Sequence, residues 1–137
     1  MSSPSRRNFF MGLLIPFAVA ACQGKGAPDI VAQQFMDSYY VNMNLDGAKK
    51  LSMGLAQEKL SDQIKLLDGQ TITAGTNVPK VTYRVLSSED GADGEKSYVF
   101  EVTPHEEEVG KRKVMVKVRQ DNGEWRVSQF VETPQGL

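Results

Sequence analysis

Few residues in this chain combine the types and the spacing that catalysis or metal binding would require. The sequence holds one cysteine, Cys22, and one histidine, His105, and neither belongs to a Cys/His cluster. Residues 105–108 read HEEE and have the side chains of a metal site. Neighbouring residues of a strand point to opposite faces, however, so these four side chains cannot converge on one ion. We therefore expect no metal, no cofactor and no catalytic set.

The amino-terminal segment has the composition of an export signal. Arg6 and Arg7 precede residues 9–21, which carry no charge, and small residues lead up to Cys22. A helix over residues 9–21 would span about 20 Å, which is short of the ~30 Å hydrocarbon core of a bilayer. The pattern therefore predicts a cleaved signal peptide over residues 1–21 rather than a permanent membrane span.

Two short motifs in this segment resemble known export and processing signals. Residues 5–11, SRRNFFM, resemble the twin-arginine export motif, although Phe10 and Met11 depart from its last two positions. Residues 19–22, VAAC, resemble the bacterial lipobox. This resemblance implies cleavage before Cys22, a diacylglycerol thioether on its sulfur and a fatty acid such as palmitate on its amine. Two alternatives stay open: export by the general route, and an ordinary signal peptide in which Cys22 is only a small apolar residue.

Lipidation would give the mature protein a membrane partner and a location in the cell envelope. Each buried CH₂ contributes about 0.8 kcal/mol, so two or three acyl chains hold a protein stably on a bilayer. Residues 22–27 then form the lipidated cysteine and a short flexible tether. In lipoproteins of two-membrane bacteria an Asp after the cysteine tends to retain the protein at the inner membrane, whereas this chain has Gln23. The resemblance thus favours the outer membrane, facing the periplasm.

The rest of the chain has the size and charge of one modest domain. Removing residues 1–21 from the 137 leaves about 116 residues, enough for a single hydrophobic core. The loss of Arg6 and Arg7 from the 16 basic residues leaves 14 against 17 acidic ones, a net charge of −3. We expect no nucleic acid partner, because the basic footprint of such proteins is missing. With no second cysteine there is no internal disulfide, so the fold must depend on packing.

The first half of the domain has helical periodicity. Apolar residues recur at spacing four from Val31 through Tyr39 to Met43, after Pro28 and Asp29, which suit a helix start. A second, short helix is predicted to open at Asn44 or Asp46, and a third helix carries Leu60, Ile64 and Leu67 and ends near Gly69. Residues 70–79 are predicted to form a loop.

The second half has strand periodicity. From residue 80 the apolar residues alternate with polar ones, and four such runs follow one another, around residues 81–85, 98–102, 114–118 and 125–131. The acidic stretch 87–96 separates the first two runs and is predicted to form a turn. The runs therefore predict a four-stranded antiparallel meander.

The turn signals predict how these strands pair. Asn122-Gly123 is a two-residue hairpin signal that sets Val118 opposite Val127 and continues to Val114 opposite Val131. A three-residue loop around residue 110 sets Val102 opposite Val118 and keeps the valines on one face. In this register Tyr83, Phe100 and Trp125 share the inner face, whereas His105, Met115 and Phe130 form an outward row. Two sets of charges also face outward: Glu101 beside Arg119, and Glu107 beside Lys113 with Glu132 beyond.

Helices followed by a curved antiparallel sheet that ends in GEWRVSQF resemble the cone-shaped nuclear-transport-factor-2-like superfamily. The resemblance covers residues 28–132, with 133–137 as a tail, and implies an α+β domain whose helices close over the concave face of the sheet. A cystatin-like arrangement is the alternative. Some members of the superfamily are isomerases or dehydratases, and many only bind.

Two candidate sites follow from these elements. Tyr39, Tyr83, Phe100 and Trp125 could line a pocket for a small apolar ligand, and His105, Met115 and Phe130 could contact another envelope protein. The sequence favours a membrane-tethered, non-catalytic binding or accessory module. The alternatives are a small isomerase- or dehydratase-like enzyme, or a purely structural envelope protein. A closed apolar core would favour a binding module, and a deep pocket with a carboxylate or a tyrosine hydroxyl would favour an enzyme.

Overall fold

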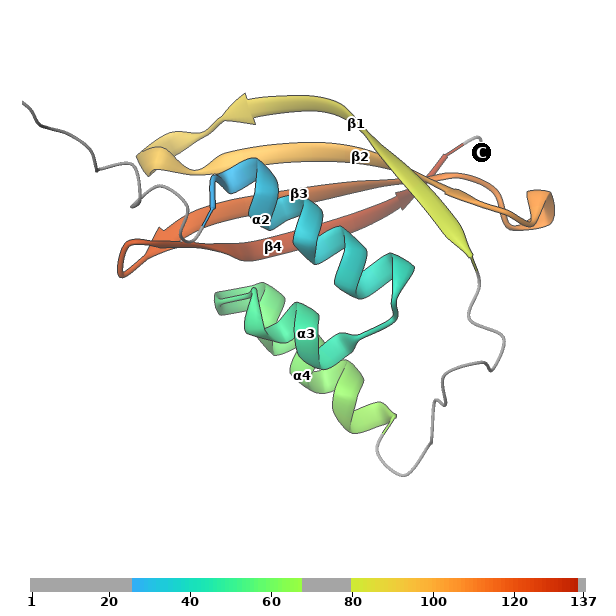
Figure 1. Ribbon diagram of the computed structural model, residues 1–137, viewed down its shortest axis with the longest axis horizontal. Helices are drawn as coiled ribbons and strands as arrows, with labels where there is room; N and C mark the ends of the chain where they lie inside the picture. The colour runs from blue at the N-terminus through green and yellow to red at the C-terminus, as the bar shows by residue number, and fades with distance from the viewer. Residues whose placement is uncertain (1–25, 68–79, 136–137) are drawn as a thin grey trace, which may run out of the picture.

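The computed structural model describes residues 26–67 and 80–135 and places the helices before the strands (Figure 1). The helical elements are α2 (Pro28–Met36), a π-helical turn η2 (Asp37–Val41), α3 (Leu45–Lys50) and α4 (Gly54–Leu66). The strands are β1 (Val81–Asp90), β2 (Lys96–Pro104), β3 (Arg112–Asp121) and β4 (Glu124–Pro134). Two short 3₁₀ turns, η3 (Ala92–Gly94) and η4 (Glu107–Val109), lie in the connections between strands.

Some of the sequence-based expectations concern residues outside these described ranges. They are the signal peptide with Arg6 and Arg7, the lipidated Cys22, the helix stop at Gly69 and the loop over residues 70–79. Within the described ranges, no helix has the length and apolar character needed to cross a bilayer.

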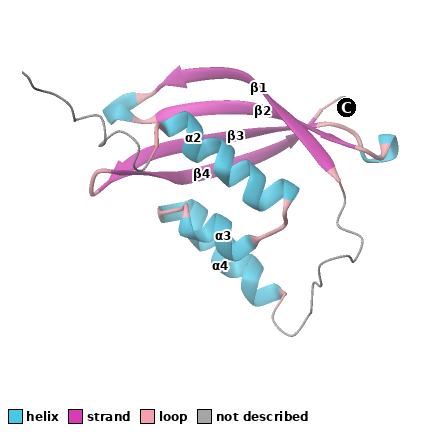
Figure 2. Ribbon diagram, in the orientation of Figure 1, coloured by secondary structure: helices cyan, strands magenta, loops and turns pink. Residues whose placement is uncertain are grey.

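The strands form one antiparallel sheet in the order β1-β2-β3-β4, and the helices lie on one of its faces (Figures 1 and 2). The α+β class predicted from the sequence is confirmed. The core lies between the two layers, where Phe35 of α2 and Phe100 of β2 are completely buried. Val114, Val116 and Val118 alternate along β3 and are also completely buried, as the period-two pattern predicts.

The first helix begins as the sequence predicts. Pro28 occupies the first turn, where its missing N–H costs nothing, and Asp29 places negative charge at the amino end of the helix dipole. The chain then widens into the π-helical turn, in which the Asn42 amide donates to the Asp37 carbonyl over 2.9 Å. This segment carries the aromatic residues Tyr39 and Tyr40.

The chain that joins the next two helices, α3 and α4, forms hydrogen bonds with the edge strand β4. The Asn44 side chain caps α3 by accepting a hydrogen bond of 2.9 Å from the Gly47 amide, as an N-cap residue should. The chain between α3 and α4 then pairs with β4 like a short parallel strand, with Ser52 opposite Val127. Because the Met53 amide donates to the Val127 carbonyl over 2.8 Å, the edge of β4 is covered at Val127.

The pairing of β2 with β3 differs from the predicted register. Val102 lies opposite Arg112 instead of Val118, because residues 105–111, including η4, make a longer connection than three residues. The difference is six residues, an even number, and side chains on a strand alternate with period two. The inner face therefore keeps its predicted residues although their partners change. The predicted pair of Glu101 with Arg119 is wrong for the same reason: Glu101 lies opposite Lys113 and bonds Arg84 over 3.0 Å.

The pairing of β3 with β4 contains a bulge that the alternation pattern does not show. The pairs Gln120–Trp125 and Val118–Val127 follow the hairpin signal, but Lys117 then lies opposite Gln129, which leaves Ser128 as an extra residue. One extra residue turns every later side chain of β4 to the opposite face. The predictions that Phe130 faces outward and that Val114 pairs with Val131 are therefore wrong, and Phe130 is 3% exposed.

The outer strand β1 is longer than predicted, and it too contains a bulge. It continues to Asp90, so the turn between β1 and β2 spans residues 91–95 instead of 87–96. The register shifts between Val85 and Ser87, which leaves Leu86 as the extra residue. At the other end of the sheet, β4 continues to Pro134 and includes two residues that were expected in the tail.

Candidate functional site

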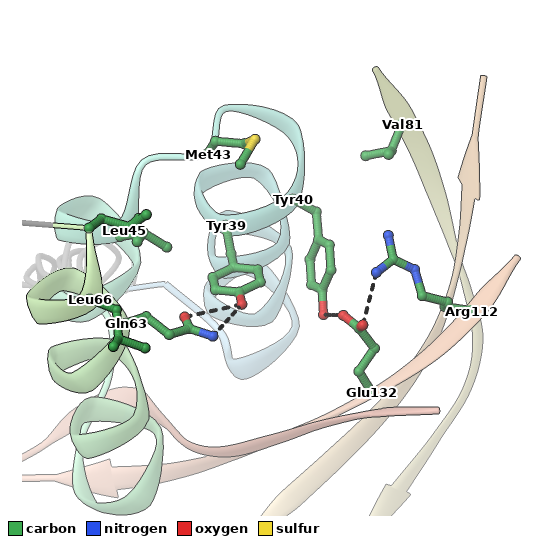
Figure 3. Close-up of a pocket in the computed structure, with 10 residues that line it drawn as sticks. Tyr39, Tyr40, Met43, Leu45, Gln63, Leu66, Val81, Arg112 and Glu132 are labelled. Atoms are coloured by element: carbon green, nitrogen blue, oxygen red, sulfur yellow. Dashed lines mark hydrogen bonds and ion pairs between the residues drawn. The ribbon is translucent and has the colours of Figure 1, made fainter. Parts of the chain in front are cut away.

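A pocket of about 420 Å³ lies between the helical layer and the sheet. This volume is within the range of small-molecule sites. Figure 3 shows its side chains, which come from the π-helical turn, α3, α4 and three of the strands. The lining residues are Tyr39, Tyr40, Met43, Leu45, Gln63, Leu66, Leu67, Val81, Arg112 and Glu132.

The π-helical turn brings two consecutive tyrosines to this pocket. In an α-helix neighbouring residues point about 100° apart, and the wider π turn changes that geometry locally. The Tyr39 and Tyr40 rings meet edge to face with centroids 4.7 Å apart, and Tyr39 also packs on Phe130 at 5.1 Å. The tyrosine pair therefore rests on the core through Phe130, while both side chains line the pocket.

One end of the pocket is a polar chain of three residues. The Tyr40 hydroxyl donates to Glu132 Oε2 over 2.6 Å, and Arg112 Nη1 donates to Glu132 Oε1 over 2.9 Å. Each oxygen of the carboxylate thus accepts a hydrogen bond from a different residue (Figure 3). Glu132 and Arg112 are about one-third exposed, which makes this a partly solvated ion pair at the pocket wall.

Both tyrosines are held in their neutral form. Burial raises the pKa of Tyr40, and the hydrogen bond to Glu132 and the negative charge of that carboxylate raise it further. Burial also raises the pKa of Tyr39, partly offset by its hydrogen bond with Gln63. The Tyr39 hydroxyl lies 2.9 Å from Gln63 Nε2 and 3.1 Å from Gln63 Oε1. The tyrosine hydroxyls of the pocket therefore act as hydrogen-bonding groups at neutral pH, not as tyrosinate bases.

The remaining wall of the pocket is apolar, and the pocket opens to solvent beside it. It consists of Met43, Leu45, Leu66, Leu67 and Val81. Leu66 is 78% exposed and Met43 is 39% exposed, so the pocket has its mouth on this side. Large apolar side chains that border an open pocket with a few polar groups are typical of a site for an amphipathic ligand.

Of the four residues predicted to form a pocket, only Tyr39 lines this one. Phe100 is completely buried in the core, and Trp125 is half-buried and packs against the core. The Tyr83 hydroxyl donates to Asp37 Oδ1 over 2.6 Å and so links β1 to the end of α2. The prediction that these four side chains share a pocket is therefore wrong, because three of them hold the layers together.

The predicted row of His105, Met115 and Phe130 is not formed. His105 is exposed and follows the end of β2, where its amide donates to the Lys80 carbonyl over 3.0 Å. Met115 lies opposite Val99 and Val131 on the face away from the helices, whereas Phe130 is buried beneath the helices. The bulge at Ser128 and the longer connection after β2 separate the three residues.

The pocket residues that the sequence did not predict include both of its charged residues, Arg112 and Glu132. Unbroken alternation along β4 places Glu132 on the outer face beside Glu107 and Lys113, but the bulge turns it inward. A signal for the bulge does exist, because Phe130 and Val131 are adjacent apolar residues and strict alternation can bury only one of them. Within the described ranges, no group of three or more His, Cys, Asp and Glu side chains could hold a metal ion.

Fold and site together define a cone-shaped α+β domain with an open, largely apolar pocket between helices and sheet. The structure is similar to that of a calcium/calmodulin-dependent protein kinase type II association domain from Thiobacillus denitrificans, with 9% identity and a TM-score of 0.57. The match covers 80% of this chain and 96% of that one, and it shows the nuclear-transport-factor-2-like fold. Of the two arrangements considered from the sequence, it supports this one over the cystatin-like one.

A second solved structure with a lower score is the intermembrane-space region of the chloroplast protein ARC6. It has 8% identity and a TM-score of 0.45, over 78% of this chain and 94% of that one. No protein-family model matches the sequence. No curated protein matches it either.

Proposed function

We propose that this protein is a lipid-anchored, non-catalytic binding module of the bacterial cell envelope, and that its pocket takes up a small, largely apolar ligand. The pocket between Tyr39, Leu45 and Leu66 is the observation that carries the binding role. The anchoring rests on the lipobox-like residues 19–22, and Gln23 favours the outer membrane, where another envelope protein would be its partner. The solved relative with the same fold is described as an association domain, which agrees with a role without chemistry.

One observation favours the alternative of an isomerase- or dehydratase-like enzyme. The pocket contains a carboxylate and a tyrosine hydroxyl in contact, at 2.6 Å between Glu132 and Tyr40, and such groups can transfer protons. Both oxygens of Glu132 already accept hydrogen bonds, however, and the raised pKa of Tyr40 keeps its hydroxyl protonated. Both groups thus form contacts between the π-helical turn and the sheet, so the arrangement suits binding better than catalysis.

Binding of an uncharged apolar dye tests the proposed role of the pocket. Nile red should bind the wild-type protein with a rise in fluorescence, and Leu66→Lys should weaken its affinity by about tenfold, because a leucine contact of ~1.5 kcal/mol is lost. Leu55→Lys is the matched control, since Leu55 is on the same helix, is 61% exposed and does not line the pocket. No binding to the wild type, or an equal loss in both variants, would contradict the proposal.

A further inference from the structure

The polar end of the pocket has more hydrogen-bond donors than acceptors. Arg112 carries five N–H groups, and Glu132 accepts from one terminal nitrogen, Nη1. Among the described residues, the other terminal nitrogen, Nη2, has no hydrogen-bond partner, and Figure 3 shows it directed toward Val81. Nε of the same guanidinium is buried and also lacks a partner in the part of the chain that the structure describes. Buried donors without acceptors, such as Nε here, are rare in folded proteins and call for an explanation.

In the structure, the acceptors of the pocket bond other groups. Glu132 already accepts from Tyr40 through Oε2 and from Arg112 through Oε1. The Gln63 side-chain oxygen lies 3.1 Å from the Tyr39 hydroxyl and is occupied there. The guanidinium therefore offers N–H groups to the pocket, next to an apolar wall that includes Leu45 and Leu67.

We infer that the pocket binds an acyl compound, with an aliphatic body along the apolar wall and a carboxylate or amide head whose oxygen accepts from Arg112 Nη2. This inference rests on the proposed binding function and adds the chemical class of the ligand. A guanidinium presents its donors in a fixed plane that matches such oxygens, and the bond is charge-assisted. Glu132 acts as a positioning residue: its bond to Nη1 holds the guanidinium in place while Tyr40 holds Glu132.

The same arrangement disfavours a cationic head group. An ammonium has donors and no acceptor, so it would add donors beside a guanidinium that already lacks partners. It would also meet the positive charge of Arg112. Head-group chemistry therefore separates the inferred ligand class from amphiphiles that share only the apolar body.

Three probes with one chain length test this inference on the wild-type protein. Octanoate, octanamide and octylammonium share an eight-carbon chain and differ in the head, and calorimetry gives the affinity of each. We expect octanoate and octanamide to bind at least about tenfold more tightly than octylammonium, as expected for one charge-assisted hydrogen bond. A larger advantage for octanoate than for octanamide would identify the acid, and the reverse would identify the amide.

Substitution of the guanidinium gives the second arm of the test. Arg112→Gln should abolish the preference for octanoate and octanamide over octylammonium, and circular dichroism should show that the variant is folded. Arg84→Gln is the matched control, because Arg84 also bonds a carboxylate over 3.0 Å, that of Glu101, but lies outside the pocket. If Arg112→Gln does not fold, the probe comparison on the wild type decides alone.

The outcomes separate this inference from the proposed function. Equal affinity for the three probes, or tighter binding of octylammonium, overturns the acyl inference and leaves an apolar pocket. If none of the three probes binds while Nile red does, the inferred ligand class is overturned as well. If neither Nile red nor any of the three probes binds, the proposed function is overturned and, with it, the inference.

Discussion

At the scale of single residues, hydroxyl groups of tyrosine connect the helical layer to the sheet. Tyr40 of the π-helical turn donates to Glu132 of β4, and Tyr83 of β1 donates to Asp37, both over 2.6 Å. Burial raises the pKa of both tyrosines, and the neighbouring carboxylates raise it further. These donors work only while they are protonated, so the contacts between the layers are coupled to pH.

The stability of the folded protein should therefore fall at alkaline pH. All four tyrosines of the chain have a raised pKa in the folded state, whereas tyrosine in an unfolded chain ionises near pH ~10. Above about pH 10 the unfolded state releases protons that the folded state retains, so the free energy of unfolding decreases as pH rises. Urea denaturation at a series of pH values from about 8 to 11 measures this slope.

Replacement of one tyrosine checks the origin of that slope. Tyr40→Phe should reduce the alkaline loss of stability, because one group with a raised pKa is removed, while the protein at neutral pH loses its bond to Glu132. Ultraviolet detection of tyrosinate should show that the tyrosines of the folded protein ionise at higher pH than those of the unfolded chain. Tyrosinate appearing in the folded protein near pH ~10 would contradict the raised pKa values.

At the scale of elements, the bulge at Ser128 decides which end of β4 contributes to the core. Before it, Trp125 and Val127 face the helices, and after it Phe130 and Glu132 do. The centre of the Phe130 ring lies 4.8 Å from that of Phe35 and 4.2 Å from Lys59 Nζ. Without the bulge, β4 would bury Val131 and turn Glu132 away from the pocket.

Two alanine substitutions at adjacent positions test this assignment. Phe130→Ala should lower the free energy of unfolding by about 3–5 kcal/mol, because it leaves a cavity under α2. Val131→Ala should lower it by less than about 1 kcal/mol, because Val131 is 39% exposed on the other face. Chemical denaturation of the two variants gives both values, and the opposite ranking would show that β4 alternates without a bulge.

At the scale of the whole molecule, the proposed anchor and the pocket would act together. Pro28, where α2 begins, is the sixth residue after Cys22, and a chain of that length reaches at most about 20 Å. A lipid on Cys22 would thus keep the domain close to a bilayer. A pocket for an acyl compound in that position would meet membrane-derived ligands at high local concentration.

Lipidation at Cys22 is directly testable in cells. Metabolic labelling with a fatty-acid analogue should label the wild-type protein, and Cys22→Ala should abolish the label, because the thioether and the new amino terminus both require that cysteine. Arg112→Gln is the control, since it changes the pocket and leaves the amino-terminal segment intact. Label that persists in Cys22→Ala would contradict the proposal of a lipoprotein.

The sequence by itself determined the elements and, for most of the sheet, the buried face. Spacing four from Val31 to Tyr39 and spacing two along β3 each place apolar side chains on one side, and burial of that side supplies the driving force. These periodicities are local, so they can be read without knowing the partners. The six-residue change in pairing between β2 and β3 did not alter the faces, because six is even.

Only the tertiary structure decided where the pocket is and which charges line it. The bulge at Ser128 is an odd insertion, so it moved both Phe130 and Glu132 from the outer face to the inner face. The adjacent apolar residues Phe130 and Val131 signal an irregularity, but the local pattern does not decide which of the two is buried. Arg112 entered the site because the length of the connection after β2 set its position in the sheet. The pairing of strands depends on the free energy of packing the helices on the whole sheet. No single segment of the sequence determines that free energy.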